Sequence, residues 1–382
     1  MTAVLFGPHT VQFPPVLRIA INAALIGKRH SGVTAYILGL IQCFSDLGHD
    51  VIVYASSPQI PSGIRITLAR CSTKLRFDAG SVGAISRFIW NQAILPFRLL
   101  NDRVDLLVCQ NTDGLLWCST PQLLVIHDLI PALYPDEAPR LHRYYKMVLP
   151  LMLRRIGVIG TVSWHTKNDL VQHYKLDPRL IQVIYNAPSA DLADHTRDRR
   201  PSALQSERYF LFVGTFAPRK NLHTVTKAFA SVVEEVGESL VVVAYPDQWM
   251  EEYLGLVKSL GLKEKVNILS GLEDGEIAYL YRQASALFLL SEYEGFGLPP
   301  IEAMSVGTPA VVSDSGALAE VAGDAAIKVK AHDVDATAEV MRNLSQDKAF
   351  RDQWRERGLK RSELFRWERT RAQLQEVLRQ FS

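Results

Sequence analysis

Cysteine is scarce in this sequence, and no two cysteines have the spacing of a metal-binding pair. The four cysteines stand at positions 43, 71, 109 and 118 of 382 residues. This pattern excludes a disulfide framework and a zinc site built on paired cysteines. Cys43 and Cys109 lie in apolar runs, so we expect them to be buried small hydrophobic residues. The reducing cytoplasm is the compartment that fits best.

Long apolar runs and an excess of one charge are missing as well. No uncharged apolar run approaches the roughly 20 residues that span a bilayer. The first residues lack the basic stretch and apolar core of a signal peptide, so we expect a cytoplasmic protein. Lys and Arg number 42 against 40 Asp and Glu, a net charge of +2, which gives no support for nucleic acid as the main partner.

Short runs rich in Val, Ile and Leu alternate with longer helical patterns over the whole chain. Most of the runs are continuous, not alternating, which is typical of parallel strands buried on both faces. The chain is too long for one ordinary core, and each half repeats strand and helix in turn. We therefore predict an α/β protein with two doubly wound domains. The predicted strands cover 17–23, 50–55, 105–110, 122–127, 157–162, 181–185, 209–214, 240–244, 266–269, 286–290, 309–313 and 326–329.

A polar stretch separates the two halves. The sequence "APSADLADHTRDRRPSALQSER" at 187–208 carries two prolines and no apolar periodicity, which indicates a linker. The predicted organisation is a first domain over 1–190, a linker over 191–206 and a second domain over 207–360. A final helix over 361–382 is expected to cross back to the first domain.

The stretch "SEYEGFGLPPIE" at 291–302 follows an apolar strand and mixes glycines, prolines and acids. Two prolines suit the first turn of a helix, so the preceding residues form a strand-to-helix loop at the carboxyl edge of a parallel sheet. The prolines have no N–H, which leaves the amides of Phe296, Gly297 and Leu298 as the donors at the helix start. Such amides bind phosphate with help from the helix dipole.

Two carboxylates and two cations complete the predicted site. Glu294 and Glu302 cannot hold a phosphate, but they can accept hydrogen bonds from sugar hydroxyls. In "GTFAPRKNL" at 214–222, Arg219 and Lys220 follow another strand of the same domain and can hold a diphosphate. Taken singly, each motif has a plain alternative, a tight turn or a solvated basic pair. Together they predict a site for a nucleotide diphosphate sugar.

These motifs resemble the retaining glycosyltransferases of family 4, which have the two-domain GT-B fold with Rossmann-like domains facing across a cleft. The E-x7-E signature is matched by Glu294 and Glu302, and the strand-turn with basic residues by "GTFAPRKN". In the first half, "GKRHSGVTAYI" at 27–37, "VIHDLIPALYP" at 125–135 and "TVSWHTKNDL" at 161–170 are similar to family segments. One departure is Ser31 before Gly32, where the family often has adjacent glycines.

The resemblance implies roles for individual residues. Glu302 is expected to hold the donor ribose, Glu294 the transferred sugar, and Arg219 with Lys220 the diphosphate. Gly271 or Leu272 is expected near the base. His127 is expected across the cleft, near the C6 hydroxyl of the sugar or the reacting centre, where it can donate a hydrogen bond to the sugar. The implied donor-binding residues are Gly32, Gly214, Arg219, Lys220, Leu272, Phe296, Gly297, Leu298 and Glu302, and the implied catalytic residues are His127 and Glu294.

The resemblance also implies chemistry and partners. The expected reaction is retaining transfer of a hexose, with mannose from GDP-mannose favoured and UDP-glucose as the main alternative. The expected acceptor is a polysaccharide or a lipid-linked oligosaccharide, and no cofactor or metal is expected. Asp333 and Asp335 form a DxD string that we interpret as a helix start.

Other interpretations remain open. An epimerase, a phosphorylase and a non-catalytic sugar-nucleotide-binding scaffold share the architecture. A structural role for His127 is an alternative to the catalytic one, and His165 is interpreted as structural or on the acceptor side. The basic and apolar stretch at 140–157 could lie on an anionic membrane surface, at the inner face of the membrane. A buried helix with basic ends is favoured there.

Overall fold

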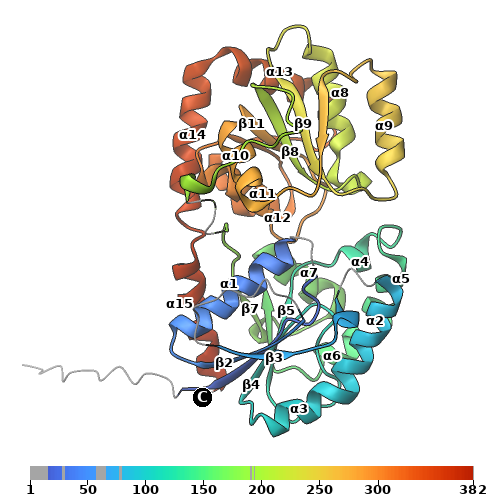
Figure 1. Ribbon diagram of the computed structural model, residues 1–382, viewed down its shortest axis with the longest axis vertical. Helices are drawn as coiled ribbons and strands as arrows, with labels where there is room; N and C mark the ends of the chain where they lie inside the picture. The colour runs from blue at the N-terminus through green and yellow to red at the C-terminus, as the bar shows by residue number, and fades with distance from the viewer. Residues whose placement is uncertain are drawn as a thin grey trace, which may run out of the picture.

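Two parallel β-sheets with helices on both faces make up the protein (Figure 1). The structure is a computed structural model that describes residues 16–27, 31–56, 66–76, 80–189, 192 and 194–381. Every strand pairing in both sheets is parallel, as the continuous aliphatic runs predict.

The first sheet has seven strands in the order β3-β2-β1-β4-β5-β6-β7. Its strands are β1 (Arg18–Asn22), β2 (Asp50–Ala55), β3 (Ile66–Arg70), β4 (Leu106–Gln110), β5 (Gln122–Ile126), β6 (Val158–Thr161) and β7 (Ile181–Val183). The six predicted strands of this half are confirmed. The edge strand β3 was missed, because its mostly exposed residues lack the aliphatic run that marks the others.

The second sheet has six strands in the order β10-β9-β8-β11-β12-β13. Its strands are β8 (Tyr209–Gly214), β9 (Ser239–Ala244), β10 (Val266–Leu269), β11 (Ala286–Leu289), β12 (Ala310–Ser313) and β13 (Ile327–Val329). All six were predicted. In each sheet the strand order reverses at a neighbouring pair, β1 and β4 or β8 and β11, and ligands bind at the carboxyl ends beside such points.

Helices cover both sheets. Those of the first half are α1 (Gly32–Asp46), α2 (Gly80–Ile89), the π-helical turn η3 (Trp90–Ile94), α3 (Leu95–Asn101), α4 (Ile130–Leu133), α5 (Pro139–Met147), α6 (Leu149–Leu153) and α7 (Trp164–Tyr174). Those of the second half are α8 (Leu222–Val232), α9 (Met250–Ser259), α10 (Asp274–Gln283), α11 (Leu298–Ser305), α12 (Gly316–Ala322), α13 (Val334–Gln346), α14 (Lys348–Ser362) and α15 (Trp367–Leu378). Asp333 caps α13 by accepting from the amide of Ala336 at 2.9 Å, which confirms the predicted helix start.

The C-terminal helices join the two halves, with α14 against the upper half and α15 beside α1 in Figure 1. The α1–α15 contact is close, because a Cβ on Gly39 would lie 2.0 Å from the Trp367 ring. The Trp367 indole also donates to the carbonyl of Pro188 at 3.0 Å. The predicted domain limits remain predictions.

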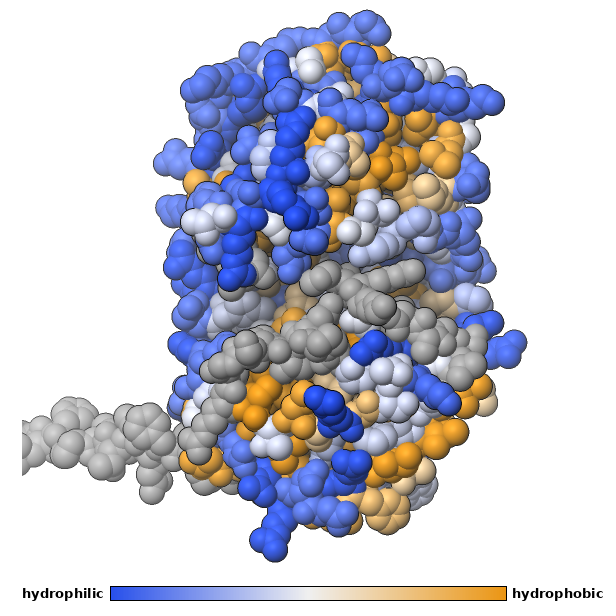
Figure 2. All heavy atoms as spheres, in the orientation of Figure 1, coloured by the Kyte–Doolittle hydropathy of each residue, from blue (hydrophilic) through white to orange (hydrophobic). Residues whose placement is uncertain are grey.

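The 140–157 segment forms two short helices broken at Val148, with Pro150 in the second. One side is buried through Tyr145, Leu149 and Met152, so a core-facing helical segment is confirmed. The other side of the segment exposes cations and apolar side chains. A separate apolar area of the same half lies over α2 and α3, at the lower right of Figure 2. Among the described residues, none of the helices has the length and apolarity needed to cross a bilayer. Cys43 and Cys109 are buried free thiols, as predicted.

Candidate functional site

The loop after β11 turns sharply into α11 at a glycine. Gly297 precedes the helix with φ +97°, a left-handed conformation that glycine adopts without strain. A Cβ at this position would also lie 2.5 Å from the Leu318 side chain of α12. The glycine is therefore required twice, for the turn and for the close approach.

The amides at the start of α11 are available to a ligand. Within the described residues, the N–H groups of Phe296, Gly297 and Leu298 have no protein acceptor, and Pro299 and Pro300 carry none. A helix N-terminus leaves such groups unsatisfied and concentrates positive potential there. This is the arrangement that the sequence predicted for an anion.

Arg219 and Lys220 lie beside this loop but face carboxylates. Lys220 Nζ is 2.5 Å from Glu294 Oε1, and Arg219 Nη1 is 3.8 Å from the same oxygen. Arg219 Nε also pairs with Glu137 Oε2 at 3.2 Å, and its Nη1 donates to the carbonyl of Tyr293 at 2.5 Å. The two cations come from the short turn after β8, so two neighbouring strands of one sheet deliver Arg219, Lys220 and Glu294, whereas Glu137 comes from the first half.

This pairing changes the electrostatic expectation for the site. The sequence suggested cations presented to a diphosphate, whereas the folded chain matches them with Glu294 and Glu137. The pairs do not exhaust the donors: in the described part of the chain Arg219 engages two of its five N–H groups and Lys220 one of three. The remaining N–H groups can contact a phosphate without breaking the existing pairs.

Burial and the cations act in opposite directions on the acids. Burial would raise the pKa of Glu294, but Lys220 and Arg219 lower it more, so its pKa falls below the ordinary value. Burial raises the pKa of Asp128, opposed by the Ile130 amide and by Arg219. Glu294 is therefore held ionised, and the pKa of Asp128 is shifted in the opposite direction, above its ordinary value.

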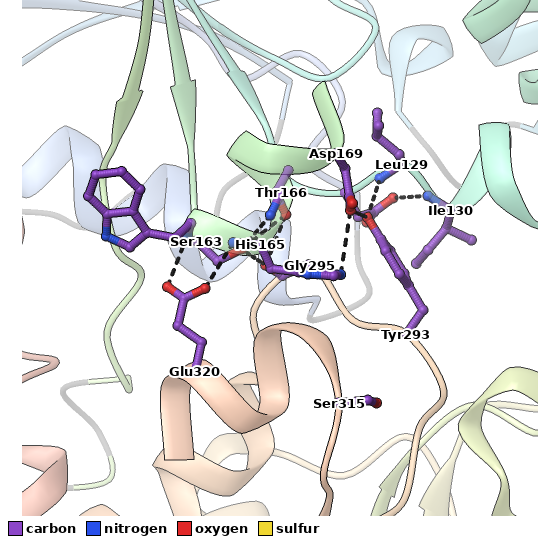
Figure 3. Close-up of polar contacts among 12 residues, drawn as sticks. Leu129, Ile130, Ser163, His165, Thr166, Asp169, Tyr293, Gly295, Ser315 and Glu320 are labelled. Carbon is purple, nitrogen blue, oxygen red and sulfur yellow. Dashed lines mark hydrogen bonds and ion pairs between the residues drawn. The ribbon is translucent and has the colours of Figure 1, made fainter. Parts of the chain in front are cut away.

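Gly295 packs its backbone directly against the first half. A Cβ on it would lie 1.9 Å from the carbonyl oxygen of His127, at the carboxyl end of β5. The Gly295 carbonyl lies 2.6 Å from the hydroxyl of Ser163 and 3.1 Å from that of Thr166, at the start of α7 (Figure 3). The loop predicted to hold the donor is thus fixed against the first half by its own backbone.

His127 is buried, and burial lowers its pKa to about 4, so the ring is neutral at neutral pH. Its Nε2 lies 2.8 Å from the side-chain oxygen of Gln110. An amide oxygen only accepts, so Nε2 carries the proton and Nδ1 is left as an acceptor. The sequence predicted that the imidazole donates a hydrogen bond to the sugar. In the structure the protonated nitrogen already donates to Gln110.

A second group of contacts ties α7 to the C-terminal half (Figure 3). The Tyr293 hydroxyl donates to Asp169 at 2.7 Å and accepts from the Leu129 amide at 3.2 Å. Glu320 of α12 accepts from the amides of Trp164 at 3.0 Å and His165 at 2.9 Å. A carboxylate from one half therefore caps the N-terminus of a helix in the other, where negative charge is favoured.

Glu302 stands apart from the Glu294 cluster. Its Oε2 accepts from the Tyr281 hydroxyl at 2.6 Å. Burial raises its pKa to about 7, against the lowering effect of the Tyr281 hydrogen bond. The pKa values of the two acids of the E-x7-E spacing are thus shifted in opposite directions, downward for Glu294 and upward for Glu302.

The other predicted residues differ in their distance from this site. Gly32 faces the second half, because its added Cβ would be 3.8 Å from Leu298 Cδ2, and a Cβ on Gly214 would be 3.8 Å from the Lys220 chain. Phe296 is buried and its ring packs near Phe365, at 5.7 Å between centroids. Leu272 lies in the loop after β10, and no contact of it with the cluster is recorded among the described residues. Lys28, Arg29 and His30 of the predicted glycine-containing loop lie outside the described residues.

Sequence reasoning missed the residues that connect the halves. Glu137, Asp128, Tyr293 and Glu320 all contact the site or fix it, yet each is a single polar residue in a loop or helix. Only "VIHDLIPALYP" contained a usable signal, because it places Asp128 at the carboxyl end of a predicted strand, and Glu137 follows its last residue by two positions. Glu320 gave none, since its partners are backbone amides about 155 positions away.

Two family models match the chain. One, described as glycosyl transferases group 1, matches residues 194–361, and the other, described as glycosyltransferase family 4, matches residues 30–191. Together they cover every strand of the two sheets except β1, and every residue of the candidate site.

Known relatives match over part of their length. The chain is 32% identical over 225 residues to the O-antigen chain mannosyltransferase RfbU of Salmonella typhimurium, covering 59% of this chain and 61% of that protein. It is 31% identical over 252 residues to O-antigen chain mannosyltransferase B of Escherichia coli, covering 63% and 66%. The matched region thus spans just under two thirds of these relatives. The sucrose-phosphate synthase of Thermosynechococcus elongatus has a similar fold, with a TM-score of 0.75, 18% identity and coverage of 95% and 98%.

Proposed function

Because the chain belongs to the glycosyltransferases of family 4 and group 1, we propose that it transfers mannose from a nucleotide diphosphate sugar to a saccharide hydroxyl. The observation that carries the proposal is the Lys220–Glu294–Arg219 cluster beside the three unsatisfied amides of the α11 loop. Mannose is chosen because both relatives named above are mannosyltransferases by name.

The donor diphosphate is placed at the start of α11. The amides of Phe296, Gly297 and Leu298 donate to its oxygens, and the uncommitted N–H groups of Arg219 and Lys220 add charge. Negative charge grows on the leaving nucleotide during transfer, so fixed donors here stabilise the transition state more than the ground state. The pairs with Glu294 and Glu137 hold both cations in place before the donor arrives.

The sugar and ribose hydroxyls are assigned to the two acids. Glu294, held ionised by its cations, accepts from the transferred hexose. Glu302 accepts from the ribose and does so best in its ionised form. Guanine is the favoured base, and UDP-glucose stays the alternative donor.

The transfer itself is proposed to retain the configuration at C1. The bond from C1 to the diphosphate oxygen breaks, a bond from C1 to the acceptor oxygen forms on the same face, and the acceptor proton passes to the leaving phosphate. No protein base is required, which agrees with a neutral His127 whose Nε2 is hydrogen-bonded to Gln110. The contact between Gly295 and the first half excludes water, which would otherwise compete as acceptor.

A panel of nucleotide sugars tests the proposal. Purified protein is incubated with GDP-mannose, UDP-glucose and related donors, and nucleotide release and thermal stabilisation are measured with and without a saccharide acceptor. We expect the largest response to GDP-mannose, and the anomeric configuration of the product, read by NMR, should match that of the donor. A stronger response to UDP-glucose than to GDP-mannose would show that glucose, not mannose, is the transferred sugar.

Matched variants separate the alternatives. Glu294→Gln keeps the size of the side chain but removes its charge, and should abolish transfer while the protein stays folded. The control is Glu339→Gln on α13, an exposed acid outside the site, which should leave transfer unchanged. Turnover of the donor without any acceptor would favour an epimerase, and binding without turnover would favour the scaffold.

A further inference from the structure

A hollow outside the donor site is lined by basic groups. It lies in the first half, with a volume of about 540 Å³, and its polar lining includes Lys146, Arg154, Lys175, His142 and His173. Of the described residues that line it, none is acidic. A second hollow of about 400 Å³ near α10 differs, because there Arg199 pairs with Glu273 and Glu276.

The three cations come from three different helix ends. Lys146 lies in the last turn of α5, Arg154 directly follows α6, and Lys175 follows α7 with φ +55°. All three side chains are exposed, and in the described part of the chain none of them forms an ion pair. In contrast to Arg219 and Lys220, these three cations have no carboxylate partner in the described part of the chain.

Compensation of helix dipoles is the ordinary reason for cations at such places. Each helix C-terminus carries about half a unit of negative charge, so three of them offset roughly half of the +3. A positive surplus remains. His142 Nδ1 is 2.9 Å from the carbonyl of Pro131, which can only accept, so Nδ1 carries its proton and Nε2 is the ring nitrogen left over.

Apolar side chains stand exposed on the same elements. Leu133 of α4 is 42% exposed, Met147 of α5 69% and Leu151 of α6 51%. Large apolar groups beside unpaired cations suit a ligand with a charged head and a hydrocarbon tail. A fully hydrated small anion would use the cations alone.

Residues of one short segment contact both the hollow and the donor cluster. Ala132 lines the hollow, and two positions later Tyr134 places its ring centroid 5.7 Å from the Arg219 guanidinium. Helix α7 spans the same interval: its first residues contact Gly295 and Glu320, and it ends at Lys175. Its 11 residues cover roughly 16 Å, so a group held in the hollow lies about one helix length from the transfer site.

We propose that this hollow binds the phosphate or diphosphate of a lipid-linked saccharide acceptor, whose sugar end extends over α4 to the donor. The proposal rests on the proposed function, since only a transferase needs an acceptor there. Lys146, Arg154 and Lys175 contact the phosphate oxygens, and Leu133, Met147 and Leu151 contact the start of the hydrocarbon chain. The acceptor is then recognised at its carrier end as well as at its reacting hydroxyl.

Binding to soluble probes tests the hollow without requiring transfer. Farnesyl diphosphate and inorganic pyrophosphate are titrated calorimetrically into the full chain with the donor site saturated by GDP-mannose. The hollow variant is Lys146→Gln/Arg154→Gln/Lys175→Gln. Its control, Lys227→Gln/Lys258→Gln/Lys263→Gln, removes three exposed cations from the second half. We expect wild type and control to bind farnesyl diphosphate at least tenfold more tightly than the hollow variant.

The other outcomes overturn the proposal in distinct ways. Equal affinity of the hollow variant and the control for farnesyl diphosphate would show that the hollow is not a binding site. A lower melting temperature of the hollow variant with unchanged binding would show that the three cations only compensate the helix dipoles. Pyrophosphate bound as tightly as farnesyl diphosphate shows a site for a soluble phosphate. Binding to phosphatidylglycerol vesicles that farnesyl diphosphate does not displace shows a membrane surface instead. If GDP-mannose does not bind the wild-type protein, the proposed donor is wrong. The affinities of the two triple variants for farnesyl diphosphate can still be compared in that case.

Discussion

Two groups of cations in this chain differ in burial and in pairing with acids. Arg219 and Lys220 have side chains only 5% and 14% exposed and are paired with acids. Lys146, Arg154 and Lys175 are exposed and form no ion pair in the described residues. A buried charge is costly without a partner, whereas an exposed one is already solvated. The buried group therefore has fixed geometry, and the exposed group adapts to a ligand and is screened by salt.

The largest effect is expected where the buried region meets the first half. Gly295→Ala places a methyl group 1.9 Å from the His127 carbonyl oxygen, and neither backbone can yield without separating the loop from β5. We expect transfer to fall by at least about 100-fold, since a displacement of about 1 Å at a reacting centre costs that much. Steady-state transfer measures it. Gly255→Ala on α9, where an added Cβ meets nothing within 4 Å, should retain activity.

Lys220→Met tests the buried pair directly. It removes a phosphate contact and leaves Glu294 with only the longer contact to Arg219, so kcat/KM should fall by roughly 100- to 1000-fold. Stability should fall as well, because breaking a buried pair costs about 3–5 kcal/mol. Kinetics and chemical denaturation measure the two effects. Lys227→Met, an exposed lysine one turn into α8, should change neither, and equal behaviour of the two variants would contradict the assignment.

The two acids should respond differently to pH. Burial raises the pKa of Glu302 to about 7, so between pH 6 and 8 its ionised fraction rises from about one tenth to nine tenths. If the ionised form accepts from ribose, affinity for GDP-mannose rises about tenfold over this range. Glu302→Gln should make the affinity independent of pH, and a flat wild-type profile would reject the ribose role.

The same shift has a consequence for the unliganded protein. The folded pKa of Glu302 lies above its ordinary value of 4.5, so the folded state favours the proton. Its contribution to stability is complete below about pH 4.5 and is lost as the pH rises through 7. Relative to Glu302→Gln, wild type should lose unfolding free energy over that window.

The smallest effect is expected at Glu320. Glu320→Gln keeps one acceptor oxygen but removes the charge that caps α7, and such a charge contributes about 1 kcal/mol. Transfer should fall about three- to tenfold, and small-angle scattering should show a larger mean radius as the halves separate more often. Glu339→Gln serves again as the control. An unchanged radius with unchanged transfer would limit Glu320 to a structural cap.

The architecture could be predicted from the linear pattern of residues. Twelve aliphatic runs became twelve strands, because a strand buried on both faces needs such a run whatever surrounds it. The α11 loop was also readable, since two prolines after two glycines leave few alternatives to a helix start. Only β3 escaped, because an exposed edge strand needs no aliphatic run.

The pairing and protonation of the charged groups could not be predicted in this way, because they depend on the folded chain. Lys220 and Glu294 were both expected at the site, but their pairing at 2.5 Å, the neutral state of His127 and the cap by Glu320 depend on atoms brought together from distant positions. The basic hollow also joins residues from three helix ends that are up to 29 positions apart. Local sequence sets which backbone forms, whereas burial and distance between remote side chains set protonation and pairing.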